Sequence, residues 1–161
     1  MATGTVLLPI LANLDNSAPA AIAFSNSIPH LLFDDTTQEY IYWSFRMPQD
    51  YASAPVLKLQ YSMVSATSNN IEFEAQVMAV SDADSQDLDS ESYDTANSQS
   101  ATVPGTVGYL DEVSLSLTNA DSAAAGDLIR IKLSRDADDG SNDTATGDLQ
   151  LWSAALEYTT S

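Results

Sequence analysis

The sequence of 161 residues predicts an all-β protein, built as a sandwich or a closed double sheet. Three observations lead to this prediction. Several segments alternate apolar and polar residues with the period of two that a half-buried strand requires. No segment carries the apolar stripe of an amphipathic helix. Finally, most of the 23 acidic residues are aspartate, which favours turns and loops over helix surfaces.

Three segments in the first half of the chain give the clearest strand predictions. Segment 38–47 is rich in aromatic and β-branched residues and ends at Pro48. Segments 56–64 and 71–80 alternate in the same way, with a turn at residues 68–70 between them. The apolar faces consist of Ile41, Trp43, Phe45 and Met47, then Leu57, Leu59, Tyr61 and Met63, then Ile71, Phe73, Ala75, Val77 and Ala79.

The second half of the chain continues the pattern with longer connections. Residues 81–94 hold six acids and no base, so we expect a loop there. Segment 95–103 is polar and predicts a weak edge strand, and segments 109–118 and 127–134 alternate again. Segment 149–159 predicts the last strand, and its alternation slips near Ser153, as a β-bulge would cause.

The N-terminal third differs because Pro9, Pro19 and Pro29 interrupt it and proline is excluded from central strands. We expect an extended arm over residues 1–19 and a β-sandwich domain over residues 20–161. The arm has more apolar surface than a free tail tolerates, so it needs a surface to lie on. That surface is either its own domain or a neighbouring subunit. The candidate contact residues are Val6, Leu7, Leu8, Ile10 and Leu11.

Composition excludes several classes of protein. Five basic residues against 23 acidic ones give a net charge of −18, which disfavours binding to nucleic acid or to an anionic membrane. The chain has no cysteine, and therefore no disulfide, thiol nucleophile or cysteine-bound metal. No apolar run approaches the 18 residues of a membrane-spanning helix, and no signal-peptide pattern follows Met1.

Catalytic candidates are weak. His30 is the only histidine and lies in an apolar stretch, so a structural role is the better interpretation. Glu72 and Glu74 share one solvated strand face and have the residue type of a glycosidase pair, but acids are abundant throughout the chain. No glycine-rich phosphate loop is present. We therefore expect a protein without catalytic activity and without a cofactor.

The acidic loops offer candidate calcium ligands, since hard cations prefer clustered oxygens. The loop after residue 135 supplies Asp136, Asp138, Asp139 and Asp143. Its spacing differs from that of an EF-hand, because Ser141 stands where glycine would be required. An ordinary solvated hairpin loop explains the same residues, so both interpretations stay open.

Tyr40 and Tyr42 lie on the polar face of segment 38–47. Exposed tyrosine on a strand is typical of subunit interfaces, where its ring buries area and its hydroxyl stays hydrogen-bonded. The same pair could serve as a stacking platform for a sugar, and we favour the interface.

Several segments of the sequence resemble a jelly-roll-type domain of structural proteins from tailed bacteriophages. These are segments 39–48, 56–66 and 70–77, then Gly126-Asp127-Leu-Ile-Arg130, Arg135-Asp136-Ala137 and Gly147-Asp148-Leu149. The resemblance covers about residues 30–160. It implies a jelly-roll-like antiparallel β-sandwich preceded by the extended N-terminal arm, and it implies a virion component without catalytic residues.

The resemblance and the small size of the chain favour a capsid decoration, or cement, protein. Such a protein would form a homotrimer, bind the major capsid protein, and be made in the host cytoplasm before joining the capsid surface of the virion. The alternative is a receptor-binding or tail-fibre tip domain that binds a host surface glycan or protein. A third hypothesis is a cellular carbohydrate-binding module.

Overall fold

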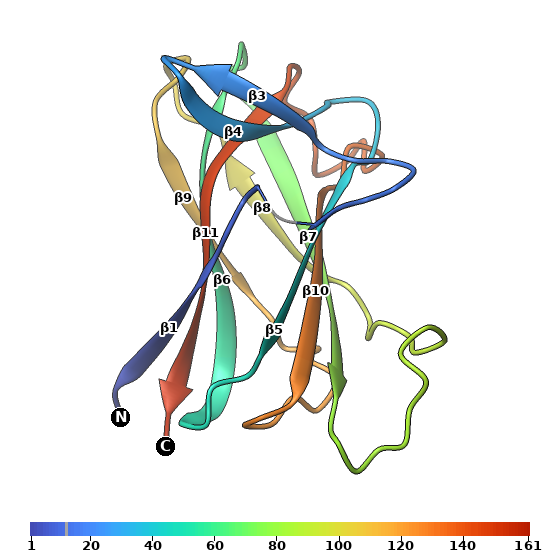
Figure 1. The fold of residues 1–161 in the computed structure, drawn as a ribbon. Helices are drawn as coiled ribbons and strands as arrows, with labels where there is room; N and C mark the ends of the chain where they lie inside the picture. Colours follow the sequence, from blue (N-terminus) through green and yellow to red (C-terminus); the bar gives the residue numbers. More distant parts are fainter. Residues whose placement is uncertain (12) are drawn as a thin grey trace.

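The computed structural model describes residues 1–11 and 13–161, and it consists of two antiparallel β-sheets packed face to face (Figure 1). The described residues contain no helix, which confirms the all-β prediction. A membrane-spanning helix is likewise not found among them. The sandwich is jelly-roll-like because neighbouring strands in each sheet come from distant parts of the chain.

The first sheet is ordered β3, β4, β11, β6 and β9, and β1 also pairs with β11. Strand β6 occupies one edge of β11, whereas β4 and β1 share the other edge. Strand β4 pairs with the start of β11, and β1 pairs with its remainder. The bounds are β1 (Thr3–Leu8), β3 (Ala21–Ser25), β4 (Ile28–Phe33), β6 (Tyr51–Met63), β9 (Asp111–Ser116) and β11 (Leu149–Thr160).

The second sheet is ordered β2, β5, β10, β7 and β8. The strongly alternating segments of the sequence form its centre, since β5, β10 and β7 lie side by side. The weak strand expected over residues 95–103 is the edge strand β8, as predicted. The bounds are β2 (Asn13–Leu14), β5 (Tyr40–Arg46), β7 (Asn70–Val80), β8 (Asn97–Thr102) and β10 (Leu128–Arg135).

The core lies between the two sheets and contains the predicted apolar faces. Trp43, Tyr61 and Phe73 are among its largest buried side chains, and the rings of Tyr61 and Phe73 meet edge to face at 5.9 Å. Burying side chains of this size stabilises the fold by about 1.5–3 kcal/mol each. The predicted bulge is confirmed, because the register of β11 against β6 shifts between Leu151 and Ser153.

The N-terminal segment forms a strand of its own domain. Thr3 to Leu8 pair with β11, so the structure places the expected arm on the same chain. The prolines explain the irregular remainder: Pro9 follows the end of β1, and Pro29 lies in the β3–β4 hairpin at the margin of the sheet. The domain boundary expected between residues 19 and 20 stays a prediction, and residue 12 lies outside the described residues.

Candidate functional site

The outer face of the second sheet gathers polar and basic side chains. On β5 and β10 the alternation that buries Ile41, Trp43 and Ile131 turns the intervening residues outward. Tyr42 stands opposite Lys132, Ser44 opposite Arg130, and Arg46 opposite Leu128. Three of the five basic residues in the chain, namely Arg46, Arg130 and Lys132, therefore lie on this one face.

A hollow of about 450 Å³ is present on this face, and we call it the tyrosine groove. Tyr42 and Arg130 line it from the sheet, Asn13 and Asp15 from β2 and the turn after it, and Leu88, Asp89, Glu91 and Tyr93 from the 81–94 loop. The groove therefore combines aromatic rings with hydrogen-bond donors and carboxylate acceptors, and most of its lining residues are polar.

The two tyrosines stand close together in this groove. The ring centroids of Tyr42 and Tyr93 are 6.2 Å apart, and the ring planes are inclined by 53°. The Tyr42 hydroxyl donates a 3.0 Å hydrogen bond to Oδ2 of Asp15, which fixes the orientation of its ring. Burial, followed by this hydrogen bond, raises the pKa of Tyr42 to about 12, so its hydroxyl remains protonated at neutral pH.

Asp15 is itself held by the turn that follows it. Its Oδ1 accepts 2.8 Å hydrogen bonds from the backbone N–H groups of Ser17 and Ala18. These bonds lower the pKa of Asp15 to about 2, because they favour the charged carboxylate. The groove thus carries a fixed, ionised acceptor at one side.

Two polar atoms of the groove have no protein partner. Among the described residues, the Tyr93 hydroxyl and Nε of Arg130 are buried without a hydrogen bond. A buried polar group without a partner costs about 1–3 kcal/mol, so such groups are normally satisfied by water or by a ligand. Both atoms belong to residues that line the groove, and each is itself covered by neighbouring protein atoms.

The remaining sequence candidates lie in different places. Tyr40 shares the face of Tyr42, as predicted, but Lys132 covers its ring, with Nζ 4.2 Å from the centroid. Of the arm residues, Leu8 is buried, and Val6 and Ile10 pack against the core. Leu7 and Leu11 are exposed, at 82% and 49%. Roles in subunit or capsid contact stay predictions for all of these residues.

The four candidate calcium ligands are not gathered around one point. The Asp143 carboxylate pairs with buried Arg135, with Oδ1 at 2.7 Å from Nη2. Asp139 accepts hydrogen bonds from the backbone of Ser141 and Asn142, while Oδ1 of Asp136 lies 3.4 Å from Nε2 of Gln38. Asp138 is exposed. Calcium binding by this loop stays a prediction.

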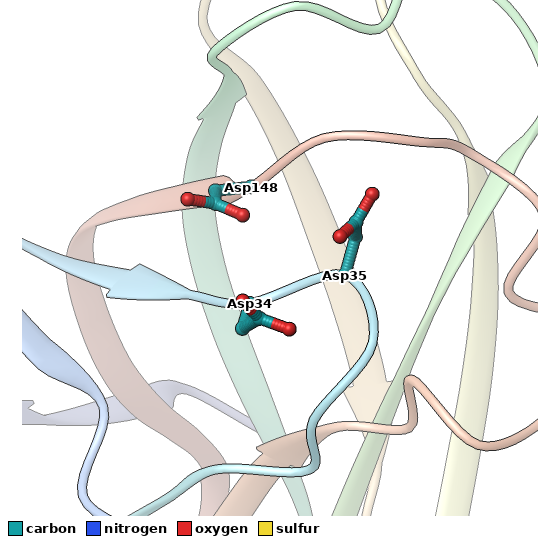
Figure 2. A group of neighbouring side chains, drawn as sticks. All are labelled: Asp34, Asp35 and Asp148. Atoms are coloured by element: carbon teal, nitrogen blue, oxygen red, sulfur yellow. The ribbon is translucent and has the colours of Figure 1, made fainter.

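Another group of carboxylates has the geometry for a cation. Asp34, Asp35 and Asp148 each offer an oxygen, and these oxygens lie within 4.8 Å of one another. Figure 2 shows them where the segment after β4 passes the start of β11. Burial, followed by the charges of Asp34 and Asp35, raises the pKa of Asp148. Among the described residues, these three could hold a hard divalent cation.

Two further expectations concern His30 and the glutamate pair. His30 is buried beneath Trp152, at 4.5 Å between ring centroids, in accord with a structural role. The glutamates depart from the expected solvated face, because Glu72 is buried at 6% exposure. Ser100 of the neighbouring strand β8 donates a hydrogen bond to its carboxylate, so the edge strand covers this position.

Comparison with known proteins defines the fold. No protein-family model matches the sequence, and no curated protein matches it. Among solved structures, the chain is similar to the Arthrobacter globiformis T6 isomalto-dextranase complexed with panose, with a TM-score of 0.58 and 10% identity. It is also similar to the arabinose-bound α-L-arabinofuranosidase MgGH51, with a TM-score of 0.54 and 12% identity.

These likenesses cover 96% and 94% of this chain but only 23% and 24% of the two enzymes. The chain thus spans about a quarter of each. The family 11 carbohydrate-binding module of Clostridium thermocellum matches 97% of this chain over 96% of its own length, with 11% identity and a TM-score of 0.49. The jelly-roll-like sandwich is therefore shown, and the bacteriophage origin stays a prediction.

Proposed function

We propose that the protein is a glycan-binding domain and that the tyrosine groove is its binding site. The observation that carries this proposal is the pair of inclined tyrosine rings, Tyr42 and Tyr93, beside the charged groups of Asp15 and Arg130. A sugar ring has an apolar face that packs on an aromatic ring, and each of its hydroxyls both donates and accepts hydrogen bonds.

The polar groups of the groove match those hydroxyls. The Asp15 carboxylate accepts hydrogen bonds and the Arg130 guanidinium donates them, while the rings of Tyr42 and Tyr93 offer apolar surface. Hydrogen bonds to ionised groups are shorter and stronger than neutral ones, so Asp15 and Arg130 would contribute most to orientation.

The similar solved structures support the binding of saccharides in general, without indicating a particular site. The two solved structures above are named as enzymes bound to panose and to arabinose. Because the chain spans about a quarter of each, we carry over saccharide recognition alone and not hydrolysis. A glycan-binding domain is also compatible with the alternative from the sequence, a receptor-binding or tail-fibre tip domain that binds a host surface glycan. The capsid decoration role, the homotrimer, the capsid partner and the virion location stay predictions, and neither the fold nor the groove favours them.

Glycan-array screening followed by calorimetry tests the proposal. We expect the wild-type protein to bind at least one glycan and Tyr93→Ala to bind it about tenfold more weakly, which corresponds to ~1.4 kcal/mol. Tyr109→Ala is the matched control, because Tyr109 is 65% exposed in the connection before β9, outside the residues that line the groove. No binding by the wild type, or equal losses in both variants, would contradict the proposal.

A further inference from the structure

We propose that the binding site continues beyond the tyrosine groove into a second hollow, so that it takes an uncharged oligosaccharide chain lying along β5 and β10. This inference rests on the proposed function and extends it from a single sugar to a chain of sugars. The second hollow also measures about 450 Å³, and Arg46, Ser81, Gln86 and Gly126 are among the residues that line it.

The two hollows follow one another along the same strands. Tyr42 lines the first and Arg46 lines the second, and both lie on the outer face of β5, four residues apart. At ~3.3 Å per residue the two positions are separated by about 13 Å. On the neighbouring antiparallel strand β10, Arg130 lines the first hollow and Leu128 lines the second. Both strands therefore place the second hollow on the same side of the first.

Leu88 joins the hollows, since it lines both of them and is 46% exposed. An apolar side chain that lines both hollows offers a contact for the apolar face of a sugar, while the sugar hydroxyls reach the polar groups on either side. The 81–94 loop is thus the common wall of an extended site.

The second hollow has donors and acceptors but no aromatic ring among its lining residues. Nε of Arg46 donates to the carbonyl oxygen of Gly126 at 3.1 Å, which holds the guanidinium in place. Among the described residues, Arg46 has no carboxylate within 4.0 Å, so its other N–H groups remain free to donate. Gln86 and Ser81 supply further hydrogen-bonding groups.

The charges on this face favour an uncharged chain. Asp15, Asp89 and Glu91 line the first hollow with Arg130, and Asp82 lines the second with Arg46. Neutral hydroxyls can hydrogen-bond to both kinds of group. A uronate or sulfate would meet several carboxylates on a molecule of net charge −18, and that repulsion disfavours it.

The test measures affinity against chain length. Calorimetry would use homo-oligomers of glucose, arabinose, galactose and mannose, each from the monosaccharide upward, and oligogalacturonate as the anionic probe. We expect affinity to rise from the monosaccharide to the oligomers for at least one neutral series. Arg46→Ala should weaken binding of the oligomers by about tenfold and so remove most of that rise. Tyr93→Ala should weaken binding at every length.

Lys58→Ala is the matched control, because Lys58 carries the same charge on the other sheet, with carboxylates 3.7 and 3.9 Å from its Nζ. Equal effects of the two variants, length-independent binding, or tighter binding of oligogalacturonate would overturn the inference and leave the proposed function standing. Failure of every probe to bind the wild type would overturn both. Equal thermal midpoints would show that Arg46→Ala folds normally.

Discussion

At the scale of single residues, Arg135 and Asp143 form an ion pair that is buried in the protein. Their side chains are 0% and 2% exposed. Nε and Nη2 of Arg135 donate to the two oxygens of Asp143, and further N–H groups reach the carbonyls of Ala145 and Gly147. This one guanidinium therefore holds the loop between β10 and β11 against the core.

We expect Asp143→Ala to lower the free energy of unfolding by about 3–5 kcal/mol, because it leaves Arg135 buried without its counter-charge. Urea denaturation measures the loss. Asp138→Ala removes the same side chain from an exposed position of the same loop, and we expect a change within about 0.5 kcal/mol. Similar values for the two variants would argue against a structural role for the pair.

In the carboxylate cluster of Asp34, Asp35 and Asp148, we expect the charges of Asp148 and Asp34 to have opposite effects on the stability of the fold. Burial raises the pKa of Asp148, so its charged form destabilises the fold above that pKa and stability is gained as the pH falls. Hydrogen bonds from Thr36 lower the pKa of Asp34, so its charge stabilises the fold above its ordinary pKa, and this stability is lost on acidification.

At pH 7 in the presence of a chelator, we therefore expect Asp148→Asn to raise the thermal midpoint and Asp34→Asn to lower it. Each variant serves as the control for the other, because both remove one charge from the same cluster. A rise of the thermal midpoint in both variants would show that mutual repulsion, and not the individual surroundings, governs the cluster, and a fall in both would contradict the expected effect at Asp148.

At the scale of elements, β1 is held against β11 by a close approach at Gly4. A Cβ atom built on Gly4 overlaps ring atoms of Tyr158, and that ring is fixed because its hydroxyl donates to Asp50 at 2.9 Å. We expect Gly4→Val to destabilise the protein by about 1–3 kcal/mol and to speed hydrogen exchange in β1. Gly105→Val is the control, since no atom beyond the adjacent residues of the chain lies within 4 Å of its Cβ position. Equal exchange rates in the two variants would contradict this account.

The sequence predicts the central strands well for a physical reason. Strands β5, β6, β7 and β10 each turn every second residue toward the core, so the core imposes a period of two on their apolar residues. Strands β1 to β4 are harder to predict, because prolines interrupt the N-terminal segment that contains them. The partner of β1 is β11, at the opposite end of the chain, and no local pattern reveals such a pairing.

The proposed binding site could be predicted only in part. Tyr42 follows from alternation on β5, whereas Tyr93 lies in an acidic loop without periodicity, and only the fold brings the two rings together. Asp148 is likewise far in sequence from Asp34 and Asp35. Their meeting depends on the pairing of β4 with β11, and sequence spacing contains no signal for it.

At the scale of the whole molecule, one stretch of the chain exposes apolar residues without carrying any charge. A surface of 7855 Å² carries a net charge of −18, yet residues 19–33 contain no Asp, Glu, Lys or Arg. Within that stretch Phe24 and Ile28 are 68% and 55% exposed on the β3–β4 hairpin, and β3 has a single neighbour in the sheet. Unpaired strand edges without charges favour association.

We therefore expect light scattering to give the monomer mass at ~0.01 M salt and a larger mass at ~1 M, since the Debye length falls from about 30 to 3 Å. Phe24→Asp should keep the monomer mass in both conditions. A mass three times that of the chain would support the homotrimer expected from the sequence. A salt-independent monomer would show that charge repulsion does not control association.

The pairing of β1 with β11 also determines how the domain would respond to mechanical force. Thr3 stands opposite Thr159, the N–H of Thr160 donates to the carbonyl of Ala2 at 3.0 Å, and the two termini emerge side by side (Figure 1). Tension applied between the ends loads the β1–β11 hydrogen bonds one after another, as in unzipping, and does not shear them together. The first strand should therefore peel away under low force, while the two-sheet core remains folded.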